Sequence, residues 1–311
     1  MSILTLQNCP ICNASQFRKL IQTKAQMHSF KCTFQFEQCE NCELVFLNPR
    51  LPIDQLKDYY SDYYLPYRGP EAWGKYENKV HRSQQKTDKK RADWLQEYHS
   101  VNSSTTILDV GCGKPTFLKT CDQKYNCNTI GIDFSDEGWK ANPSEYELID
   151  LRVGEVKDLP ADLRPDIITM WHYLEHDYDP IETLKRLKSI AHPQTTLIIE
   201  VPNYDSESRK KFRENWAGFH TPRHTFLFTP ETISLALKES GWKAKNINTF
   251  GTLDPYVLYW MSKMEQKGID WSKSMDSEFL NYVMGMIKFL PKRFRGSKKS
   301  LGIMTAIASP V

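Results

Sequence analysis

The sequence lacks a long apolar segment: no uninterrupted run of about 18 apolar residues, the length that a membrane-spanning helix needs, occurs in its 311 residues. It also begins without the apolar segment that directs secretion. In such a chain the eight cysteines are expected to bind metal or to remain free thiols rather than to form a disulfide framework. We therefore expect a cytoplasmic protein.

A large charge of either sign is missing as well. Lysine and arginine number 41 against 38 aspartates and glutamates, so the net charge is only +3 at pH 7. A charge this small does not by itself indicate a nucleic-acid partner. The hydrophobic fraction of 40% and the charged fraction of 25% are typical of a globular protein. The length allows one full-sized domain plus a small one.

Four of the cysteines form two Cys-x-x-Cys pairs separated by 26 residues: Cys9, Cys12, Cys39 and Cys42. Four thiolates at this spacing suit a tetrahedral zinc ion, and a closed thiolate shell leaves no open position for chemistry, which indicates a structural site. A module of about 50 residues can build only a small core, so the metal should supply much of its stability. Cys32 lies outside the spacing and is expected to be a spare thiol.

Two short apolar segments carry the glycines and acids of a nucleotide-binding site. The first, residues 106–110, contains Asp109 and is followed by Gly111 and Gly113; the second, residues 129–133, ends at Asp133. The glycines let the backbone approach a ligand, and the second acid can bind ribose hydroxyls. A dinucleotide fingerprint would have a third glycine at position 116, where this chain has Thr116.

Apolar runs that end in turn residues recur through the rest of the chain, at residues 150–153, 166–171, 196–201, 244–250 and 301–309. Helical stretches lie between them, and those at 180–190 and 230–240 begin with proline, which is favoured in the first turn. Alternating strands and helices predict an α/β fold. We expect a doubly wound, Rossmann-like, mostly parallel sheet of seven strands, preceded by a small zinc ribbon.

Motifs along most of the chain resemble those of the bacterial class I S-adenosylmethionine (SAM) methyltransferases that carry an amino-terminal zinc ribbon. Asp109, two residues before the first glycine, resembles motif I of class I, and residues 44–50 match an L-V-F-L-N-P-R run. The W-H-x-L-E-H, E-V-P-N and P-R-H-x-x-x-F-T motifs are matched by residues 171–176, 200–203 and 222–229. The resemblance implies SAM as the cofactor and says little about the acceptor.

The resemblance implies a set of cofactor-binding residues: Asp109, Gly111, Gly113, Asp133, Glu155, Val156, Trp171 and His172. The first three would hold the methionine portion and shape the turn, and Asp133 would bind the ribose. Glu155 would bind the adenine amine, the N–H of Val156 would face the ring, and the last two residues would lie beside the cofactor. Pro115 departs from the family's usual third glycine. Proline is acceptable in the first turn of a helix, but it puts the affinity for the cofactor in question.

The candidate catalytic bases are four histidines: His172, His176, His220 and His224. A pKa near neutrality suits histidine as a general base, and we favour His224. Arg223 could clamp an anionic group of the substrate through its planar fork, or it could tie the loop down. His172, Glu175 and His176 share one helical face, so they could bind a divalent metal that polarises a hydroxyl. The alternative, which we favour, is that Glu175 and His176 form local hydrogen bonds.

Residues 253–300 interrupt the last two strands and are expected to shape substrate specificity. An apolar stretch covers residues 279–290. Six basic residues lie in it or just after it, with no acidic residue among them: Lys288, Lys292, Arg293, Arg295, Lys298 and Lys299. Such a segment could make a peripheral contact with an anionic membrane through residues 279–299, at the inner membrane surface. It could instead form an apolar lid over the substrate pocket, beside a solvated basic loop, and we favour the lid.

The predicted organisation is a zinc ribbon over residues 1–50, a connector over 51–100 and a SAM-dependent methyltransferase domain over 101–311. The connector should contain one long capping helix from about Trp73 to Tyr98. Its tyrosines, residues 59–67, could line the mouth of an active site or pack between ribbon and domain, and we favour packing.

The predicted reaction is transfer of a methyl group from SAM to a small-molecule, glycan or lipid-linked acceptor, at oxygen; the oligomeric state is left open. One alternative is an RNA-modifying methyltransferase that uses the ribbon. Against it, the segment between the cysteine pairs has four basic residues and no aromatic–basic interleaving. The other alternative is a non-catalytic ribbon protein whose cofactor site Pro115 has degraded.

Overall fold

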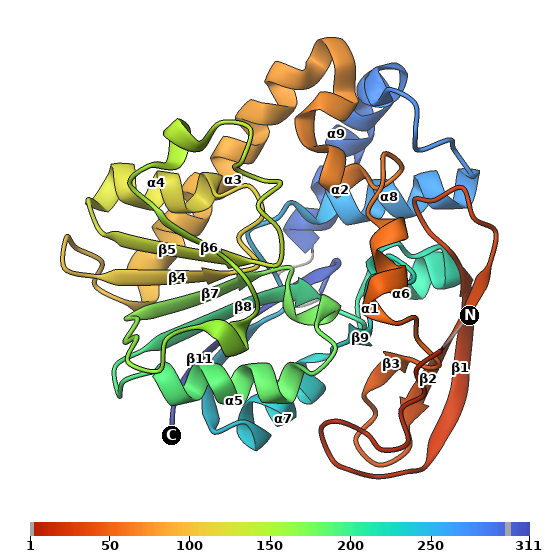
Figure 1. Ribbon diagram of the computed structural model, residues 1–311. Coiled ribbons are helices and arrows are strands. Elements are labelled where there is room, and N and C mark those ends of the chain that lie inside the picture. Colours follow the sequence, from red (N-terminus) through yellow and green to blue (C-terminus); the bar gives the residue numbers. More distant parts are fainter. Residues whose placement is uncertain (1–2, 296–299) are drawn as a thin grey trace. The chain divides into compact units, whose positions relative to one another are not determined.

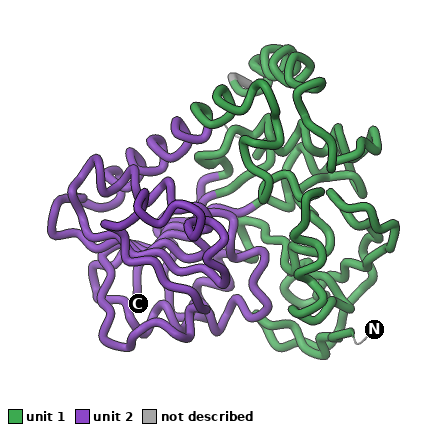
Figure 2. Tube along the Cα trace, turned by 45° about the horizontal axis from the view of Figure 1, so that its top comes forward, with its two compact units in different colours: residues 1–83, 202–232, 249–304 green, residues 84–201, 233–248, 305–311 purple. Residues whose placement is uncertain are grey.

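The computed structural model describes residues 3–295 and 300–311 (Figure 1). The chain divides into two compact units, each assembled from three segments (Figure 2). Unit 1 contains Met1–Ser83, Pro202–Thr232 and Thr249–Met304, and unit 2 contains Gln84–Val201, Ile233–Asn248 and Thr305–Val311. The three-part division predicted from the sequence follows other boundaries and stays a prediction.

Unit 2 is built on a seven-stranded sheet with the order β10-β11-β8-β7-β4-β5-β6. The strands are β4 (Thr106–Val110), β5 (Asn128–Asp133), β6 (Asp150–Val153), β7 (Ile167–Trp171), β8 (Thr196–Pro202), β10 (Trp242–Asn248) and β11 (Ile303–Pro310). The pairs from β8 across to β6 are parallel, and β10 pairs with β11 antiparallel. The predicted mostly parallel seven-stranded sheet is confirmed.

Helices cover both faces of this sheet (Figure 1). The helices α3 (Glu77–Tyr98) and α4 (Thr116–Tyr125) lie on one face, and α5 (Pro180–Ile190) and α7 (Pro230–Glu239) lie on the other. Phe117 and Cys121 of α4 pack with the strand residues Ile107 and Ile167 in the core of the unit. The long helix expected from about Trp73 begins at Glu77, because residues 69–76 form 3-10 turns with a kink at Gly74.

Unit 1 contains a four-stranded sheet with the order β1-β2-β3-β9. The strands are β1 (Phe17–Lys24), β2 (Thr33–Cys39), β3 (Val45–Leu47) and β9 (Phe226–Leu227). All three pairings are antiparallel, and in the last one Val45 is paired with Leu227 and Phe46 with Phe226. The sheet of the amino-terminal module therefore includes a strand from far along the chain.

The helices of unit 1 pack on one aromatic core. They are α1 (Ile53–Leu56), α2 (Leu65–Arg68), α6 (Glu207–Phe212), α8 (Pro255–Lys267) and α9 (Phe279–Arg295). Trp73 contacts Trp260 of α8 and Tyr282 of α9, with ring centroids 5.2 and 5.4 Å apart. Of the tyrosine cluster, Tyr59 and Tyr64 are buried and Tyr67 is 52% exposed, so the packing interpretation stays a prediction. Among the described residues, no helix has both the length and the apolar character needed to cross a membrane.

Candidate functional site

The predicted cofactor-binding residues lie at the carboxyl ends of neighbouring strands in unit 2. From β4 the chain proceeds outward through β5 and β6, and it then returns to the other side of β4 with β7 and β8. The strand order therefore reverses between β4 and β7, and doubly wound folds bind their ligands at such a reversal. Asp109 and Asp133 lie at or next to the last residue of β4 and β5, and Trp171 ends β7.

A glycine turn follows β4 and is fastened to the end of β5. Gly111 has a φ of 71° and Gly113 a φ of 48°, in the left-handed region that side chains disfavour. The N–H of Gly111 donates to the carbonyl oxygen of Ile132 at 2.8 Å. The N–H of Gly113 donates to Oδ2 of Asp133 at 2.9 Å. The acid predicted to bind ribose is therefore also the residue that positions the turn.

Two close approaches enclose this turn. A Cβ at Gly111 would lie 2.3 Å from Cδ2 of Tyr173, and a Cβ at Gly138 would lie 2.2 Å from the carbonyl oxygen of Gly113. Side-chain carbons do not approach other atoms this closely, so both positions require glycine. The loop of residues 134–139 after β5 and the Tyr173 ring after β7 consequently border the same backbone turn.

The two acids of the site differ in their surroundings. Asp109 is 4% exposed, and its Oδ1 accepts a hydrogen bond from the Thr169 hydroxyl at 2.6 Å. Burial outweighs this hydrogen bond and raises the pKa of Asp109 to about 7. Burial also raises the pKa of Asp133, although the backbone N–H bonds that it accepts act in the opposite direction. Asp109 thus bonds within the sheet, whereas Asp133 bonds to the turn.

The predicted adenine-binding residues lie in a short turn after β6. Glu155 precedes the 3-10 turn η4 (Val156–Asp158), and its backbone N–H donates to Oδ2 of Asp158 at 2.8 Å. The Glu155 side chain forms an exposed ion pair with Lys157 at 2.5 Å, while Val156 is buried. Pro115 directly precedes α4, so its missing N–H removes no hydrogen bond from the helix interior.

His172 is held between two buried carboxylates of unit 2. Its Nε2 lies 3.1 Å from Oε1 of Glu200, and its Nδ1 lies 3.5 Å from Oε1 of Glu175. Both glutamates are at most 1% exposed. Burial of the ring opposes its charge, but the two carboxylates outweigh burial and raise the pKa of His172 to about 9. His172 is therefore an imidazolium at neutral pH. His176 ends the neighbouring 3-10 turn η5 (Leu174–His176).

His220 and His224 lie together in a buried loop of unit 1, with ring centroids 4.5 Å apart. Nδ1 of His224 lies 2.8 Å from the carbonyl oxygen of Gly218. A carbonyl can only accept, so Nδ1 of His224 carries a proton and donates it to Gly218. Nδ1 of His220 lies 3.2 Å from the Tyr64 hydroxyl.

The Arg223 side chain is buried and is held by hydrogen bonds and a ring contact inside unit 1. It is 0% exposed, and its two terminal nitrogens donate to the carbonyl oxygens of Tyr59 and Gln26, each at 2.7 Å. The guanidinium carbon lies 3.9 Å from the centroid of the Tyr64 ring. Burial lowers the pKa of Arg223. This geometry favours the loop-fastening role over the substrate clamp.

The four paired cysteines converge in unit 1. The sulfurs of Cys9, Cys12, Cys39 and Cys42 all lie within 4.8 Å of one another. Both Cys-x-x-Cys turns have the same backbone pattern: the residue four positions after the first cysteine donates its N–H to that cysteine's carbonyl oxygen and has a positive φ, 58° at Asn13 and 63° at Glu43. Tetrahedral zinc places its thiolates ~3.8 Å apart, so the four sulfurs could hold such an ion.

Three residues of the site escaped the sequence analysis: Tyr173, Gly138 and Glu200. Glu200 had a visible signal, since a charged residue inside the apolar strand 196–202 is rarely buried without a partner. The contacts of Tyr173 and Gly138 with the glycine turn depend on loop conformations, which leave no periodic pattern in the sequence.

Comparisons with known proteins address the family and the fold of the chain. Residues 79–246 match the sequence profile of a family described as "Methyltransferase domain". The chain is 33% identical over 100 residues to the mitochondrial ubiquinone biosynthesis O-methyltransferase of Candida albicans, a match that covers 28% of this chain and 31% of that protein. The chain thus spans about a third of the length of this curated relative.

Solved structures are similar to this chain at low identity. A Galdieria sulphuraria protein provisionally described as a sarcosine dimethylglycine methyltransferase has a TM-score of 0.51 and 12% identity, over 74% of this chain and 87% of that one. A cyclopropane synthase from Mycobacterium tuberculosis has a TM-score of 0.49 and 16% identity, over 71% of this chain and 82% of that one. Because the family profile covers more than half of the sequence, the chain belongs to the methyltransferase domain family and is a SAM-dependent methyltransferase.

Proposed function

We propose that SAM binds at the glycine turn of unit 2, with its ribose on Asp133 and its adenine against Glu155 and the N–H of Val156. The observation that carries this proposal is the 2.9 Å bond between the Gly113 N–H and Asp133 at the reversal of strand order. A carboxylate oxygen has two lone pairs, so Asp133 can hold the turn and still accept from ribose hydroxyls. Trp171 and His172 would border the cofactor from β7.

The residues fit this cofactor. Gly111 and Gly138 are closed in by Tyr173 and by the carbonyl of Gly113, and this packing fixes the turn, whereas a Cβ at Gly113 would meet nothing within 4 Å. The open space beside Gly113 is where a ligand could approach the backbone. Pro115 stands outside the hydrogen-bonding part of α4 and leaves the turn intact. When bound, SAM supplies a methyl group activated by its sulfonium. The protein's part is to hold the acceptor in line with that methyl group, which contributes up to ~7–11 kcal/mol to lowering the barrier.

Among the four candidate histidines, we favour His224 as the general base and exclude His172. A base must be neutral at the operating pH, whereas His172 is protonated between its two glutamates. Nδ1 of His224 is engaged by the carbonyl oxygen of Gly218, so Nε2 is the ring nitrogen that we propose for proton transfer. We therefore propose that Nε2 of His224 accepts the acceptor's proton, and that His172 is a positioning residue.

The acceptor is proposed to be a small molecule, a glycan or a lipid-linked molecule that is methylated at oxygen. The similarity to a ubiquinone biosynthesis O-methyltransferase supports transfer to oxygen. An apolar partner is supported by α9, whose outward side chains Leu280, Met284 and Ile287 are 63%, 53% and 58% exposed and follow helical spacing. Such a stripe beside lysines suits a lipid surface. Of the basic residues predicted to flank it, Lys298 and Lys299 lie outside the described residues. Family membership argues against the non-catalytic alternative.

The cysteine cluster is proposed to hold a structural zinc ion. The donor set is four thiolates, the set that zinc prefers in closed structural sites. Both knuckles present their sulfurs through the same backbone turn, a pattern that four unrelated cysteines would not share. The ion would brace the chain around β1 and β2.

Calorimetric titration of SAM into zinc-replete protein tests the cofactor site. We expect micromolar affinity, and a loss of at least tenfold for Asp133→Asn, because the amide replaces one acceptor oxygen with a donor nitrogen and removes the negative charge. Asp162→Asn, an exposed acid outside the loops that border the glycine turn, is the matched control. Equal affinity in the Asp133 variant would remove that residue from the ribose site.

Transfer of a labelled methyl group tests the base. Methyl-labelled SAM is incubated with lipid and polar fractions of a cell extract, and incorporation is compared for wild type, His224→Gln and His81→Gln, an exposed histidine of α3. We expect incorporation to fall ~100-fold or more only in the His224 variant, with SAM affinity retained. Undiminished incorporation would transfer the role to His176 or His220.

A further inference from the structure

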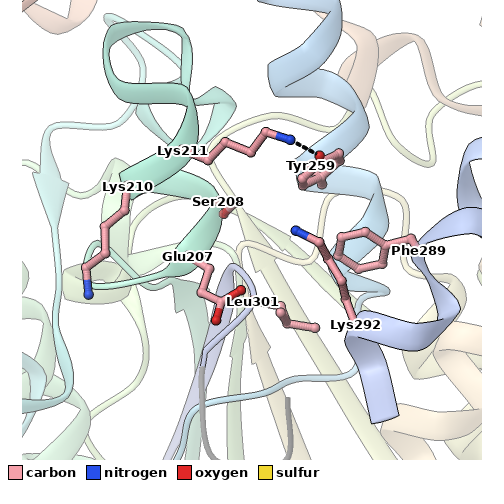
Figure 3. Close-up of a pocket in the computed structure, with 8 residues that line it drawn as sticks. All are labelled: Glu207, Ser208, Lys210, Lys211, Tyr259, Phe289, Lys292 and Leu301. Atoms are coloured by element: carbon pink, nitrogen blue, oxygen red, sulfur yellow. Dashed lines mark hydrogen bonds between the residues drawn. The ribbon is translucent and has the colours of Figure 1, made fainter. Parts of the chain in front are cut away.

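A pocket of about 270 Å³ opens between α6, α8 and α9 of unit 1 (Figure 3). It has no part in the proposed cofactor site, which lies in unit 2. Two groups of side chains line it, one charged or polar and one apolar: Glu207, Ser208, Lys210, Lys211, Lys292, and Tyr259, Phe289, Leu301.

Two ammonium groups converge on one aromatic ring in this pocket. Nζ of Lys211 lies 4.7 Å from the centroid of the Tyr259 ring, and Nζ of Lys292 lies 5.4 Å from the same centroid. Nζ of Lys211 also donates a hydrogen bond to the Tyr259 hydroxyl. Figure 3 shows the two lysines reaching toward this ring from α6 and α9, whereas Lys210 points away. Contact with an aromatic face orients a cation but does not neutralise it.

Neither of these lysines has a carboxylate partner among the residues that the structure describes. Lys210 is paired with Asp205 at 2.7 Å, and Arg293 of the same helix is paired with Asp254. Lys211 and Lys292 form no ion pair of this kind. Residues 279–311 contain no aspartate or glutamate, so α9 and the strand that follows cannot supply one. Two like charges at one ring repel each other, and an anion between them would remove that repulsion.

The rest of the pocket is apolar. Phe289 packs 5.0 Å from the Tyr259 ring, centroid to centroid, and Leu301 adds an aliphatic side chain. The lysine stems extend this apolar lining, since their methylene groups lie below the charged ends. A volume of about 270 Å³ is at the lower limit for small-molecule sites. It suits one ring or a short alkyl chain.

We propose that this pocket binds the anionic group of a small amphiphile, a phosphate monoester joined to a short apolar chain or ring, between Lys211 and Lys292. The apolar body lies on Phe289 and Leu301, and the phosphate oxygens accept hydrogen bonds from the two ammonium groups. Phosphate is favoured because it offers several acceptor oxygens to two separate cations. The site does not rest on the proposed methyl transfer, because all of its residues belong to unit 1 and none is assigned to SAM or to proton transfer.

Calorimetric titration with octyl phosphate, kept below its micelle-forming concentration, tests the proposal. Octyl glucoside carries the same chain without charge, and inorganic phosphate carries the charge without the chain. We expect octyl phosphate to bind at least tenfold more tightly than either, since both parts of the ligand contact the pocket. Equal binding of octyl glucoside, or of inorganic phosphate, would overturn the proposal.

Variants locate the binding. Lys211→Met and Lys292→Met keep the apolar stem, and each should weaken octyl phosphate about tenfold; screening of these exposed ammonium groups keeps the effect moderate. Lys288→Met, an exposed lysine on α9 outside the pocket, is the matched control. Glu207→Gln removes the pocket's acid and should tighten binding severalfold. Unchanged affinity in both pocket variants would refute the site.

Two further measurements complete the test. One identifies the source of the phosphate, and the other checks that each variant keeps its cofactor site intact. Sedimentation with phosphatidylcholine vesicles that contain phosphatidic acid shows whether a membrane headgroup can supply the anion. Lysine-dependent binding to these vesicles would identify a lipid source, and its absence alongside lysine-dependent octyl phosphate binding would identify a free ligand. SAM affinity should be unchanged in every variant, which distinguishes failure of this site from failure of the cofactor site.

Discussion

Replacing His172 with asparagine removes a cation that lies between the buried carboxylates of Glu175 and Glu200. The two carboxylates raise the pKa of His172 to about 9 in the folded protein, against about 6.5 in an unfolded chain. Because the folded-state pKa is the higher one, proton binding stabilises the folded protein. This stabilisation is fully present below about pH 6.5 and is lost as the pH rises through about 9.

The difference of about 2.5 pKa units corresponds to ~3 kcal/mol of the free energy of unfolding, at ~1.4 kcal/mol per unit. Other groups titrate in the same range, among them Asp109 with its pKa of about 7. The informative quantity is therefore how much more stability the wild type loses than the His172→Asn variant when the pH is raised.

Urea unfolding of wild type, His172→Asn and His81→Asn at about pH 6.5 and about pH 9.5 measures this difference. We expect the wild type and the His81 control, whose ring is exposed on α3, to lose ~3 kcal/mol more than the His172 variant. Parallel losses in all three proteins would show that His172 is not protonated between its glutamates, and the assignment of His172 as a positioning cation would fail.

Three further changes test other parts of the structure. Cys9→Ser should lower the bound zinc below one ion per chain in a metal assay, whereas Cys32→Ser, an exposed cysteine outside the cluster, should leave the content unchanged. Gly138→Ala should weaken SAM at least tenfold in a calorimetric titration, because the new Cβ would lie 2.2 Å from a carbonyl oxygen of the glycine turn; unchanged affinity would mean that the loop adapts. Thr169→Val removes the hydroxyl that donates to Asp109 at 2.6 Å and should lower the free energy of unfolding by ~1–3 kcal/mol, as judged by the urea midpoint.

Most strands of unit 2 could be predicted because they are short apolar runs that end in a turn residue or an acid. The exception is β10, which contains two lysines and two asparagines and begins two residues before the predicted segment. The parallel direction of most strands also followed from the sequence, since helices separate the strands, whereas the strand order did not. The acids after β4 and β5 could be placed for the same reason, because carboxyl ends of parallel strands share one edge of the sheet.

Other features depend on contacts between distant segments and could not be predicted. β9 has two residues, too few for a periodic signal, and only its pairing with Val45 and Phe46 makes it a strand. The sequence allowed Arg223 either to bind an anionic group of the substrate or to hold its own loop in place. The second role is favoured only because the carbonyls of Tyr59 and Gln26 lie within hydrogen-bond distance. The His172 ring lies between Glu175 and Glu200 in a turn where His172 itself has a φ of 58°. The sequence gives no sign of this backbone conformation.

The late strand β9 has a consequence for how the chain is made. Residues 48–225 separate β3 from β9 in the sequence, so the four-stranded sheet stays open at one edge while most of the chain is synthesised. Both cysteine knuckles are complete by Cys42 and form from local contacts, so zinc can bind during this interval. Closing the sheet requires a loop across most of the chain, a step with a high entropic cost and a slow rate. During synthesis, β3 therefore presents an unpaired edge that a chaperone or a second nascent chain can reach.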